Sequence, residues 1–260
     1  MEDKAESWRL DLKTDKEAVK RQAAWAGISP GMRVLDVGCG SGSATSALAE
    51  LVGPTGFLTA IDISEDRLEA ARKNYSGENI EYLRHDIRSP FINSTQFDAV
   101  WSRFFLEYFR RNQREILFNS LMSLRNGGIA CIADLDNNSL GHFGMSQRLI
   151  TTLKYIMELL ENQGDFDPYA GRKIYGHLHA LGYKSISCTL EAHHLVCGSG
   201  NAKERYNWMR KVDVAVKNSG YCFPEYDGDY SQFRNEVKEF LESPSRFTYT
   251  PLIIVRGIKP

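Results

Sequence analysis

The chain has 260 residues, which is enough for one large domain or for a domain with a cap, each with a substantial core. Its 32 Lys and Arg residues balance 33 Asp and Glu residues, and a formal charge of −1 gives no sign of a nucleic-acid-binding track. No apolar run approaches the roughly 18 residues of a membrane span, and the charged start Met1-Glu2-Asp3-Lys4 leads into no apolar signal segment.

An amphipathic helix is predicted in the second half of residues 7–26. Apolar residues recur there at helical spacing as far as Trp25, and Gly27 and Pro30 then end the pattern. Aromatic side chains at this spacing usually pack in a core. We therefore expect its aromatic rings to pack in the core, and the helix to fold over the strand ends together with the inserted segments described below.

The densest signal is the run Val34-Leu35-Asp36-Val37-Gly38-Cys39-Gly40-Ser41-Gly42. An apolar stretch meets an acid, glycines recur at every second position, and helix-compatible spacing resumes at Ala44. This pattern predicts a strand, a tight loop and a helix. Glycine lets the backbone adopt positive φ and lie close to a ligand, and the first N–H groups of the helix are free to bind a polar or anionic group.

A second predicted strand, 57–62, follows the turn 53–56 and ends at Asp62. In nucleotide-binding sheets, an acid at this place accepts hydrogen bonds from both hydroxyls of a ribose. The same carboxylate could instead cap the next helix, because Ser64-Glu65-Asp66-Arg67 is an N-cap sequence.

Three further strands alternate with helices. Helix 65–74 precedes strand 80–84, a fourth strand runs from Phe97 to near Ser102, and helix 112–125 leads to strand 129–134. This alternation predicts a doubly wound, mostly parallel α/β sheet whose ligand crevice lies at the carboxyl ends of its strands. Asp36, Gly38, Asp62, Asp86 and Ser102 all fall at such ends.

The glycines at 38, 40 and 42, with Asp36 before them, resemble motif I of the class I S-adenosylmethionine-dependent methyltransferases, (D/E)-x-G-x-G-x-G. A dinucleotide fingerprint, G-x-G-x-x-G, would place its third glycine at position 43, where the chain has Ser43. Residues Leu124 to Ile129 fit the family pattern L-x-x-G-G-x. The resemblance covers about 30–135, 170–198 and the last predicted strand.

The resemblance implies S-adenosyl-L-methionine as cofactor. It implies that Asp86 accepts a hydrogen bond from the adenine amino group and that Ile87 packs on the ring. An N-terminal segment often covers the cofactor in this family, which draws attention to Trp8 and Arg9. The expected cofactor-binding residues are Asp36, Gly38, Cys39, Gly40, Gly42, Asp62, Ile63, Asp86, Ile87, Ser102 and Arg103.

The second half of the chain adds two helical segments, 136–168 and 199–244, to the minimal core of this family. Helix 170–181 and strand 185–196 restore the core, and the last strand, 247–257, lies antiparallel between strands five and six in the family. The segments are rich in aromatic residues, so we expect them to fold over the strand ends as a lid. They could instead form a satellite core or a dimer interface.

The expected architecture is therefore one domain, 1–260, with the Rossmann-like methyltransferase fold and a seven-stranded sheet whose last strand is antiparallel. Its parts are an N-terminal helical segment at 1–27, a cofactor-binding half at 28–135, cap insertions at 136–168 and 199–244, and the remaining core at 169–198 and 245–260.

The cofactor carries its own leaving group, so the protein must align a nucleophile with the methyl group and exclude water. Proton acceptors near the acceptor could come from Glu107, Asp136, His142 or the His193-His194 pair, and Glu107 and His142 are our catalytic candidates. Residues expected to line the acceptor pocket are Phe104, His142, Tyr169, Arg172 and Tyr249.

The acceptor is expected to be a small, apolar or aromatic molecule, methylated by in-line SN2 transfer. Enzymes that methylate exocyclic amines often carry N-P-P-Y or D-P-P-Y after the fourth strand, whereas this chain has Ser-Arg-Phe-Phe at 102–105. Two alternatives stay open: a nicotinamide-dependent oxidoreductase on a Rossmann sheet, and a non-catalytic cofactor-binding module. Ser43 and the antiparallel last strand argue against the oxidoreductase.

No metal site is predicted, because His177-x-His179 and His193-His194 lack a suitably spaced carboxylate or cysteine. The five cysteines are odd in number, form no C-x-x-C pair and lie mostly in apolar runs, which predicts buried thiols and a cytoplasmic protein. We expect no nucleic-acid partner and a monomer or homodimer.

Overall fold

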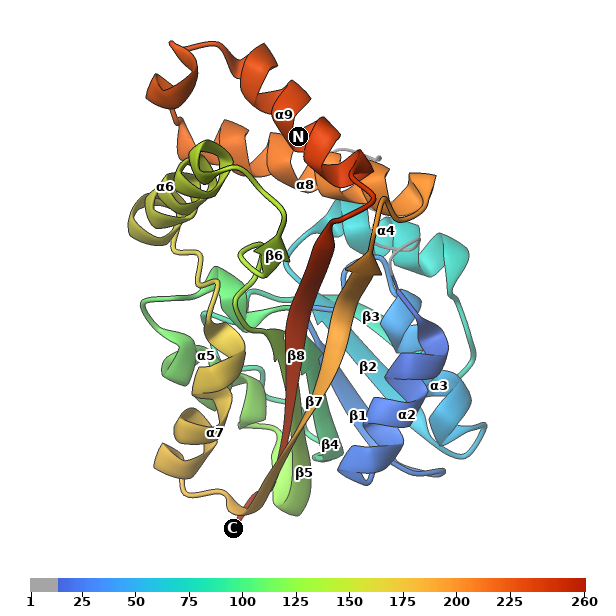
Figure 1. The fold of residues 1–260 in the computed structure, drawn as a ribbon. Helices are drawn as coiled ribbons and strands as arrows, with labels where there is room; N and C mark the ends of the chain where they lie inside the picture. Colours follow the sequence, from blue (N-terminus) through green and yellow to red (C-terminus); the bar gives the residue numbers. More distant parts are fainter. Residues whose placement is uncertain (1–13) are drawn as a thin grey trace.

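A computed structural model describes residues 14–260, in which one mixed sheet carries helices on both faces (Figure 1). The expectations for Trp8 and Arg9 lie outside the described residues. The strands are β1 (Arg33–Val37), β2 (Phe57–Asp62), β3 (Ile80–Arg84), β4 (Phe97–Arg103), β5 (Leu124–Leu135), β6 (His142–Phe143), β7 (Lys184–Cys197) and β8 (Phe247–Ile258).

The sheet has the order β3-β2-β1-β4-β5-β8, and β7 pairs with the other edge of β8. Strands β1 to β5 are parallel, whereas β8 is antiparallel to both β5 and β7. The predicted fold class is therefore confirmed, including the place of the antiparallel last strand. The eighth strand, β6, has two residues and pairs with the first residues of β8.

Register brings the expected site together at one edge of the sheet. Val37 lies opposite Ile61 on one side and Ser102 on the other, so the residues that follow these three positions meet at the carboxyl ends of the strands. The order of strands reverses between β1 and β4, and ligands of doubly wound sheets bind at such a point.

Helices cover the two faces of the sheet unequally (Figure 1). Helices α2 (Lys16–Ala26), α3 (Ser43–Val52) and α4 (Glu65–Asn74) pack on one face, and α5 (Gln113–Leu121) and α7 (Ala170–Ala180) pack on the other. Val19 and Ala23 of α2 are fully buried, but Trp25 is 37% exposed. Helix α2 thus packs on a face of the sheet and not over the strand ends, and the expected core packing of the Trp25 ring is wrong because smaller side chains make the buried contacts.

The predicted helix 112–125 extends too far. Helix α5 ends at Leu121, and β5 begins at Leu124. The ammonium group of Lys259 donates hydrogen bonds to the carbonyl oxygens of Leu121, Met122 and Leu124, and the N–H of Gly127 donates to the carbonyl of Lys259. These partners lie more than 130 positions away in the chain, so local spacing could not reveal where the helix ends.

The prediction of buried thiols is wrong for three of the five cysteines. Cys39 and Cys131 are buried, whereas Cys188, Cys197 and Cys222 are exposed. Two of the exposed thiols belong to β7, where only Val196 is buried. The apolar runs of β7 are like those of a central strand, but within residues 14–260 this strand pairs with β8 alone, on one edge.

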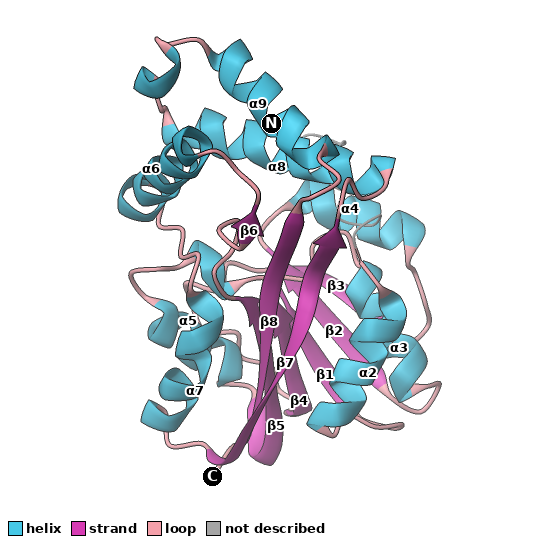
Figure 2. Ribbon diagram, in the orientation of Figure 1, coloured by secondary structure: helices cyan, strands magenta, loops and turns pink. Residues whose placement is uncertain are grey.

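The remaining helices form a separate layer, here called the cap, beyond the carboxyl ends of β1 to β5 (Figure 2). The cap consists of α6 (Gln147–Gln163), α8 (Ala202–Ser219), the short helix η2 (Pro224–Tyr226) and α9 (Tyr230–Glu242). It has an apolar core distinct from the three apolar clusters against the sheet. The buried residues of this core are Leu149, Ile156, Trp208, Val212, Phe223, Tyr226, Phe233, Val237, Phe240 and Leu241.

Candidate active site

The glycine loop after β1 needs glycine for two separate reasons. Gly38, Gly40 and Gly42 have φ values of +75°, +54° and +87°, a region that other residues rarely adopt. A Cβ on Gly38 would also lie 2.4 Å from Cδ2 of Phe105, and one on Gly42 would lie 2.8 Å from Cβ of Ala71. The loop is therefore closely packed on both sides.

Asp62 holds this loop from the end of β2. Its Oδ2 accepts a hydrogen bond from the N–H of Gly40 at 2.9 Å, and its Oδ1 accepts one from the N–H of Ser64 at 3.0 Å. The N-cap of α4 is Ser64, whose hydroxyl oxygen accepts from the N–H of Arg67. Each carboxylate oxygen of Asp62 still has a second lone pair that can accept a hydrogen bond.

A cavity of about 270 Å³, here called the strand-end cavity, opens at this place. It contains five of the expected cofactor-binding residues, together with side chains that follow β4. Its lining includes Gly38, Asp62, Ile63, Asp86, Ile87, Phe104, Phe105, Tyr108 and Phe109. A short helix, η1 (Leu106–Tyr108), follows β4 and shapes the wall that these aromatic rings form.

Asp86 does not stand alone in this cavity. The guanidinium group of Arg88 donates to both of its carboxylate oxygens, at 2.7 to 3.0 Å, and lowers the pKa of Asp86. Asp86 is therefore an ionised acceptor that a ligand amino group would share with Arg88.

Six other expected residues do not line the strand-end cavity. Ser102 donates its hydroxyl to the carbonyl of Val37 at 3.1 Å, and Asp36 accepts the hydroxyl of Thr45 at 2.7 Å. Arg103 places its guanidinium 4.2 Å from the centre of the Phe104 ring, and burial lowers the pKa of Arg103 to about 10. The other three residues of the six are Cys39, Gly40 and Gly42, which belong to the glycine loop itself.

Asp36 gives a pH-dependent prediction. Burial raises the pKa of Asp36 to about 7, against an unfolded value of about 3.9. The native state therefore holds an extra proton between these two values, and its free energy of unfolding falls as the pH rises from about 4 to about 7. We expect Asp36→Asn to lose less stability than the wild type between about pH 5 and pH 8, measured by urea unfolding. Equal losses in the two proteins would contradict this account.

A second and larger cavity, of about 460 Å³, lies between the strand ends and the cap. We call it the cap cavity. Its walls are mostly apolar and come from α6 and α8, and Glu107, Leu135 and Asn138 contribute from the sheet side. Tyr108 lines both this cavity and the strand-end cavity, so the two adjoin at that ring.

A chain of polar side chains crosses the wall of the cap cavity. Asn138 donates its amide N–H to Oε2 of Glu107 at 2.6 Å, and its amide oxygen accepts from the ammonium group of Lys211 at 2.5 Å. Glu107 and Asn138 are buried, and the N–H of Asn138 donates to the carbonyl of Pro168. This chain joins helix α8 of the cap to the short helix η1 that follows β4.

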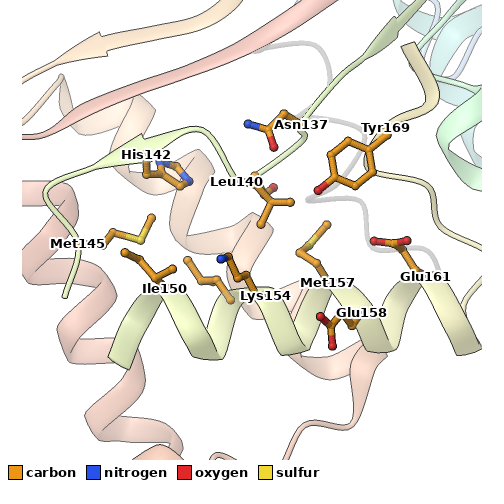
Figure 3. Close-up of a pocket in the computed structure, with 12 residues that line it drawn as sticks. Asn137, Leu140, His142, Met145, Ile150, Lys154, Met157, Glu158, Glu161 and Tyr169 are labelled. Carbon is orange, nitrogen blue, oxygen red and sulfur yellow. The ribbon is translucent and has the colours of Figure 1, made fainter. Parts of the chain in front are cut away.

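His142, the other catalytic candidate, lies in a third hollow of about 330 Å³ between α6 and residues 137–145 (Figure 3). Its Nδ1 is 2.9 Å from the hydroxyl of Thr248, and its ring packs edge-on against Trp208 and Phe240. Burial, followed by the charges of Arg246 and Lys211, lowers the pKa of His142 to about 3. At neutral pH this imidazole is a weak base.

The five residues expected to line the acceptor pocket lie in different places. Phe104 lines the strand-end cavity, whereas Tyr169 lies at the end of the hollow opposite His142 (Figure 3). Arg172 forms two hydrogen bonds, at 2.7 and 2.8 Å, with Asp136. Tyr249 is 39% exposed on β8 and lines none of these cavities.

Sequence reasoning missed Phe105, Tyr108, Asn138 and Lys211. Phe105 directly follows Ser-Arg-Phe and Tyr108 lies three residues further on, so the position of the fourth strand could have identified them. Nothing local marks Asn138 or Lys211, because their meeting depends on how α8 docks.

Two kinds of feature are absent from the part of the chain that the structure describes. Residues 14–260 contain no group of three or more His, Cys, Asp or Glu side chains arranged to hold a metal ion. Within the same residues, every helix is too short or too polar to cross a bilayer.

A doubly wound sheet, a glycine loop after β1, an acid at the end of β2 and a cavity at the β1/β4 reversal together define a nucleotide-type cofactor-binding domain. Residues 34–128 match the family model described as a methyltransferase domain. The demethylmenaquinone methyltransferase of Staphylococcus aureus is 40% identical over 82 residues, which are 31% of this chain and 34% of that relative. Residues 34–128 are therefore a methyltransferase domain of the class I S-adenosylmethionine-dependent type, with S-adenosyl-L-methionine as cofactor.

Solved structures agree on the fold. Phosphoethanolamine N-methyltransferase 2 of Haemonchus contortus, in complex with S-adenosyl-L-methionine, aligns with a TM-score of 0.51 and 17% identity over 89% of this chain and 49% of its own. The [4+2]-cyclase SpnF aligns with a TM-score of 0.56 and 16% identity over 94% of this chain and 81% of its own. The match to the curated relative spans about a third of that protein, 34% of its length.

Proposed function

We propose that this protein transfers a methyl group from S-adenosyl-L-methionine to a small, largely apolar acceptor by in-line SN2 displacement. The observation that carries the proposal is the pair of adjoining cavities that share Tyr108. One has the residues of a cofactor site, and the other has apolar walls and about 460 Å³ of space. Pockets that bind small molecules are generally concave and mostly apolar, with a few placed polar groups.

The residues of the strand-end cavity fit this cofactor. Gly38 lets the ring of Phe105 pack directly against the loop, and the second lone pairs of Asp62 can accept the two ribose hydroxyls. Ile87 offers an apolar surface for the adenine ring beside the carboxylate of Asp86. The cofactor supplies both the methyl group and its leaving group, because the sulfonium becomes a neutral thioether on transfer.

The remaining tasks belong to the chain itself: orienting the acceptor and excluding water. The rings of Phe104, Phe105 and Tyr108 wall the strand-end cavity, and α6 closes the cap cavity from above. Of the two catalytic candidates, Glu107 lines the cap cavity and His142 lies in the outer hollow. We therefore retain Glu107 as the carboxylate that can face the acceptor.

Incubation with S-adenosylmethionine labelled in its methyl group, together with a small-molecule extract, tests the proposal directly. We expect label in a small apolar product, and much less product from Asp62→Ala at a cofactor concentration near the wild-type dissociation constant. The alternatives predict different results. A non-catalytic module would bind the cofactor and form no labelled product. A nicotinamide enzyme would be stabilised by NADH alone, by about 2.7 kcal/mol at 100 times the dissociation constant.

We also infer a cytoplasmic protein that acts without a nucleic-acid partner, as a monomer or homodimer. All five cysteines are unpaired, as in proteins of a reducing compartment. The formal charge of −1 supports a small-molecule acceptor over a polyanion.

A further inference from the structure

The cap cavity and the outer hollow have a wall in common. Ser139, Leu153 and Met157 line both spaces, so these residues separate the two. Tyr108 joins the cap cavity to the strand-end cavity in the same way. The cap cavity therefore adjoins both the cofactor site and the outer hollow, through different residues.

Two of the three wall residues are apolar side chains of α6. Leu153 and Met157 are four positions apart in the helix, so they lie on one face of it, about a turn apart. Met157 is 6% exposed and points from α6 toward Leu140 on the other side of the outer hollow (Figure 3). A methionine side chain is unbranched and has three rotatable bonds, so it adapts easily to a neighbouring group. The wall can therefore open by rotation of side chains.

Much of the lining of the outer hollow is apolar or uncharged. Leu140, Met145 and Ile150 contribute apolar surface. His142 lies beside them (Figure 3), and burial lowers its pKa to about 3, so its ring is neutral at physiological pH. An apolar group that entered from the cap cavity would exchange water for these side chains, which is favourable.

The charged side chains of the outer hollow have solvent or a partner. Lys154 and Glu158 are exposed, so their charges stay hydrated. Glu161 has its carboxylate 3.7 Å from the guanidinium group of Arg110. A molecule in the hollow therefore needs no charge of its own to balance these residues.

We infer that the methyl acceptor is elongated, with a head group in the cap cavity and an unbranched apolar tail that passes Leu153 and Met157 into the outer hollow. This inference rests on the proposed function, for which it names the class of acceptor. Tyr108 marks the part of the cap cavity next to the cofactor, so the head would react there and the tail would extend toward the shared wall. A methylene chain is narrow enough to pass between two side chains, whereas a second ring is not.

4-Alkylbenzyl alcohols with tails of one to nine carbons test this inference, because they differ only in the length of an uncharged tail. Binding is measured by calorimetry with S-adenosylhomocysteine present. We expect wild-type affinity to rise about fourfold for each added methylene group, the usual effect of burying one. The rise should continue to the longest tails, because the outer hollow adds about 330 Å³ to the space of the cap cavity.

Leu140→Trp fills the outer hollow and leaves the cap cavity intact, since Leu140 lines the hollow and not the cap cavity. We expect this variant to bind the nonyl probe at least tenfold more weakly and to bind 4-methylbenzyl alcohol as the wild type does. Met157→Phe makes the wall itself stiffer and should also act on long tails more than on short ones. Tyr155→Trp places a large ring on the exposed face of α6, outside all three spaces, and is the matched control.

Thermal unfolding checks that each variant is folded. Equal losses for short and long tails would overturn the inference, because Leu140 and Met157 would then only maintain the cap. Unchanged binding of the nonyl probe in both variants would overturn it too, as would a wild type that binds this probe no more tightly than 4-methylbenzyl alcohol. Binding of S-adenosylhomocysteine alone separates these outcomes from failure of the proposed function. Its absence defeats both, whereas labelled product from a compact acceptor without a tail defeats only the inference.

Discussion

Asp62→Ala is expected to weaken the binding of S-adenosylhomocysteine by roughly 10- to 150-fold, the usual worth of hydrogen bonds to a charged group. The carboxylate would lose the two ribose hydroxyls, and the N–H groups of Gly40 and Ser64 would lose their acceptor. Isothermal titration calorimetry measures the change.

Asp62→Asn should weaken the binding of S-adenosylhomocysteine almost as much as Asp62→Ala. The two backbone N–H groups bond to different carboxylate oxygens, so an amide NH₂ would face an N–H donor whichever way the side chain turned. Glu69→Ala removes an exposed acid from α4 and serves as the control. Unchanged affinity in both Asp62 variants would show that this residue does not bind the ribose.

Gly38→Ala is expected to have the largest effect on the loop. A non-glycine residue at a φ of +75° costs roughly 1–2 kcal/mol, and overpacking against Phe105 adds roughly 1–3 kcal/mol. The ring lines the strand-end cavity, so any movement that relieves the contact changes the space for the cofactor. We expect lower thermal stability and loss of measurable binding of S-adenosylhomocysteine.

Two further variants separate the causes. Gly53→Ala carries the same kind of strain, with a φ of +69° and no atom within 4 Å of the added Cβ, so it should lose stability and keep the cofactor. Gly38→Ala combined with Phe105→Ala removes the clash and should regain part of the affinity. If the double variant binds no better than Gly38→Ala, the contact with Phe105 is not what excludes the cofactor.

Local pattern was enough to predict the strands and the glycine loop that surround the strand-end cavity. Glycines at alternate positions leave few backbone conformations open, and an acid at the end of a second parallel strand must lie beside them because the register of a sheet is regular. Asp62 and Asp86 therefore lie where their positions in the chain implied. Predicting these two positions required no information about contacts between residues far apart in the chain.

The positions of the residues around the cap cavity and the outer hollow could not be predicted, because they depend on contacts between residues far apart in the chain. The outer hollow separates His142 from Glu107 because residues 137–145 turn away to form β6, a pairing of two residues with β8. Lys211 and Asn138 are 73 positions apart, and they meet only because α8 packs on α6. The exposure of the two thiols of β7 could not be predicted from local sequence either, because the burial of a strand depends on which elements cover it.

The cap has an apolar core of its own, so the cap and the sheet are two separately packed parts of one chain. Residues around the glycine loop contact the sheet and its helices, so a substitution there alters the packing of Gly38 or the hydrogen bonds of Asp62. Residues of α6 and α8 that face the cap cavity belong to a different core. Related proteins can thus diverge in what they methylate while they keep the same donor, and a designer who wishes to change the acceptor has a region that can be rebuilt separately.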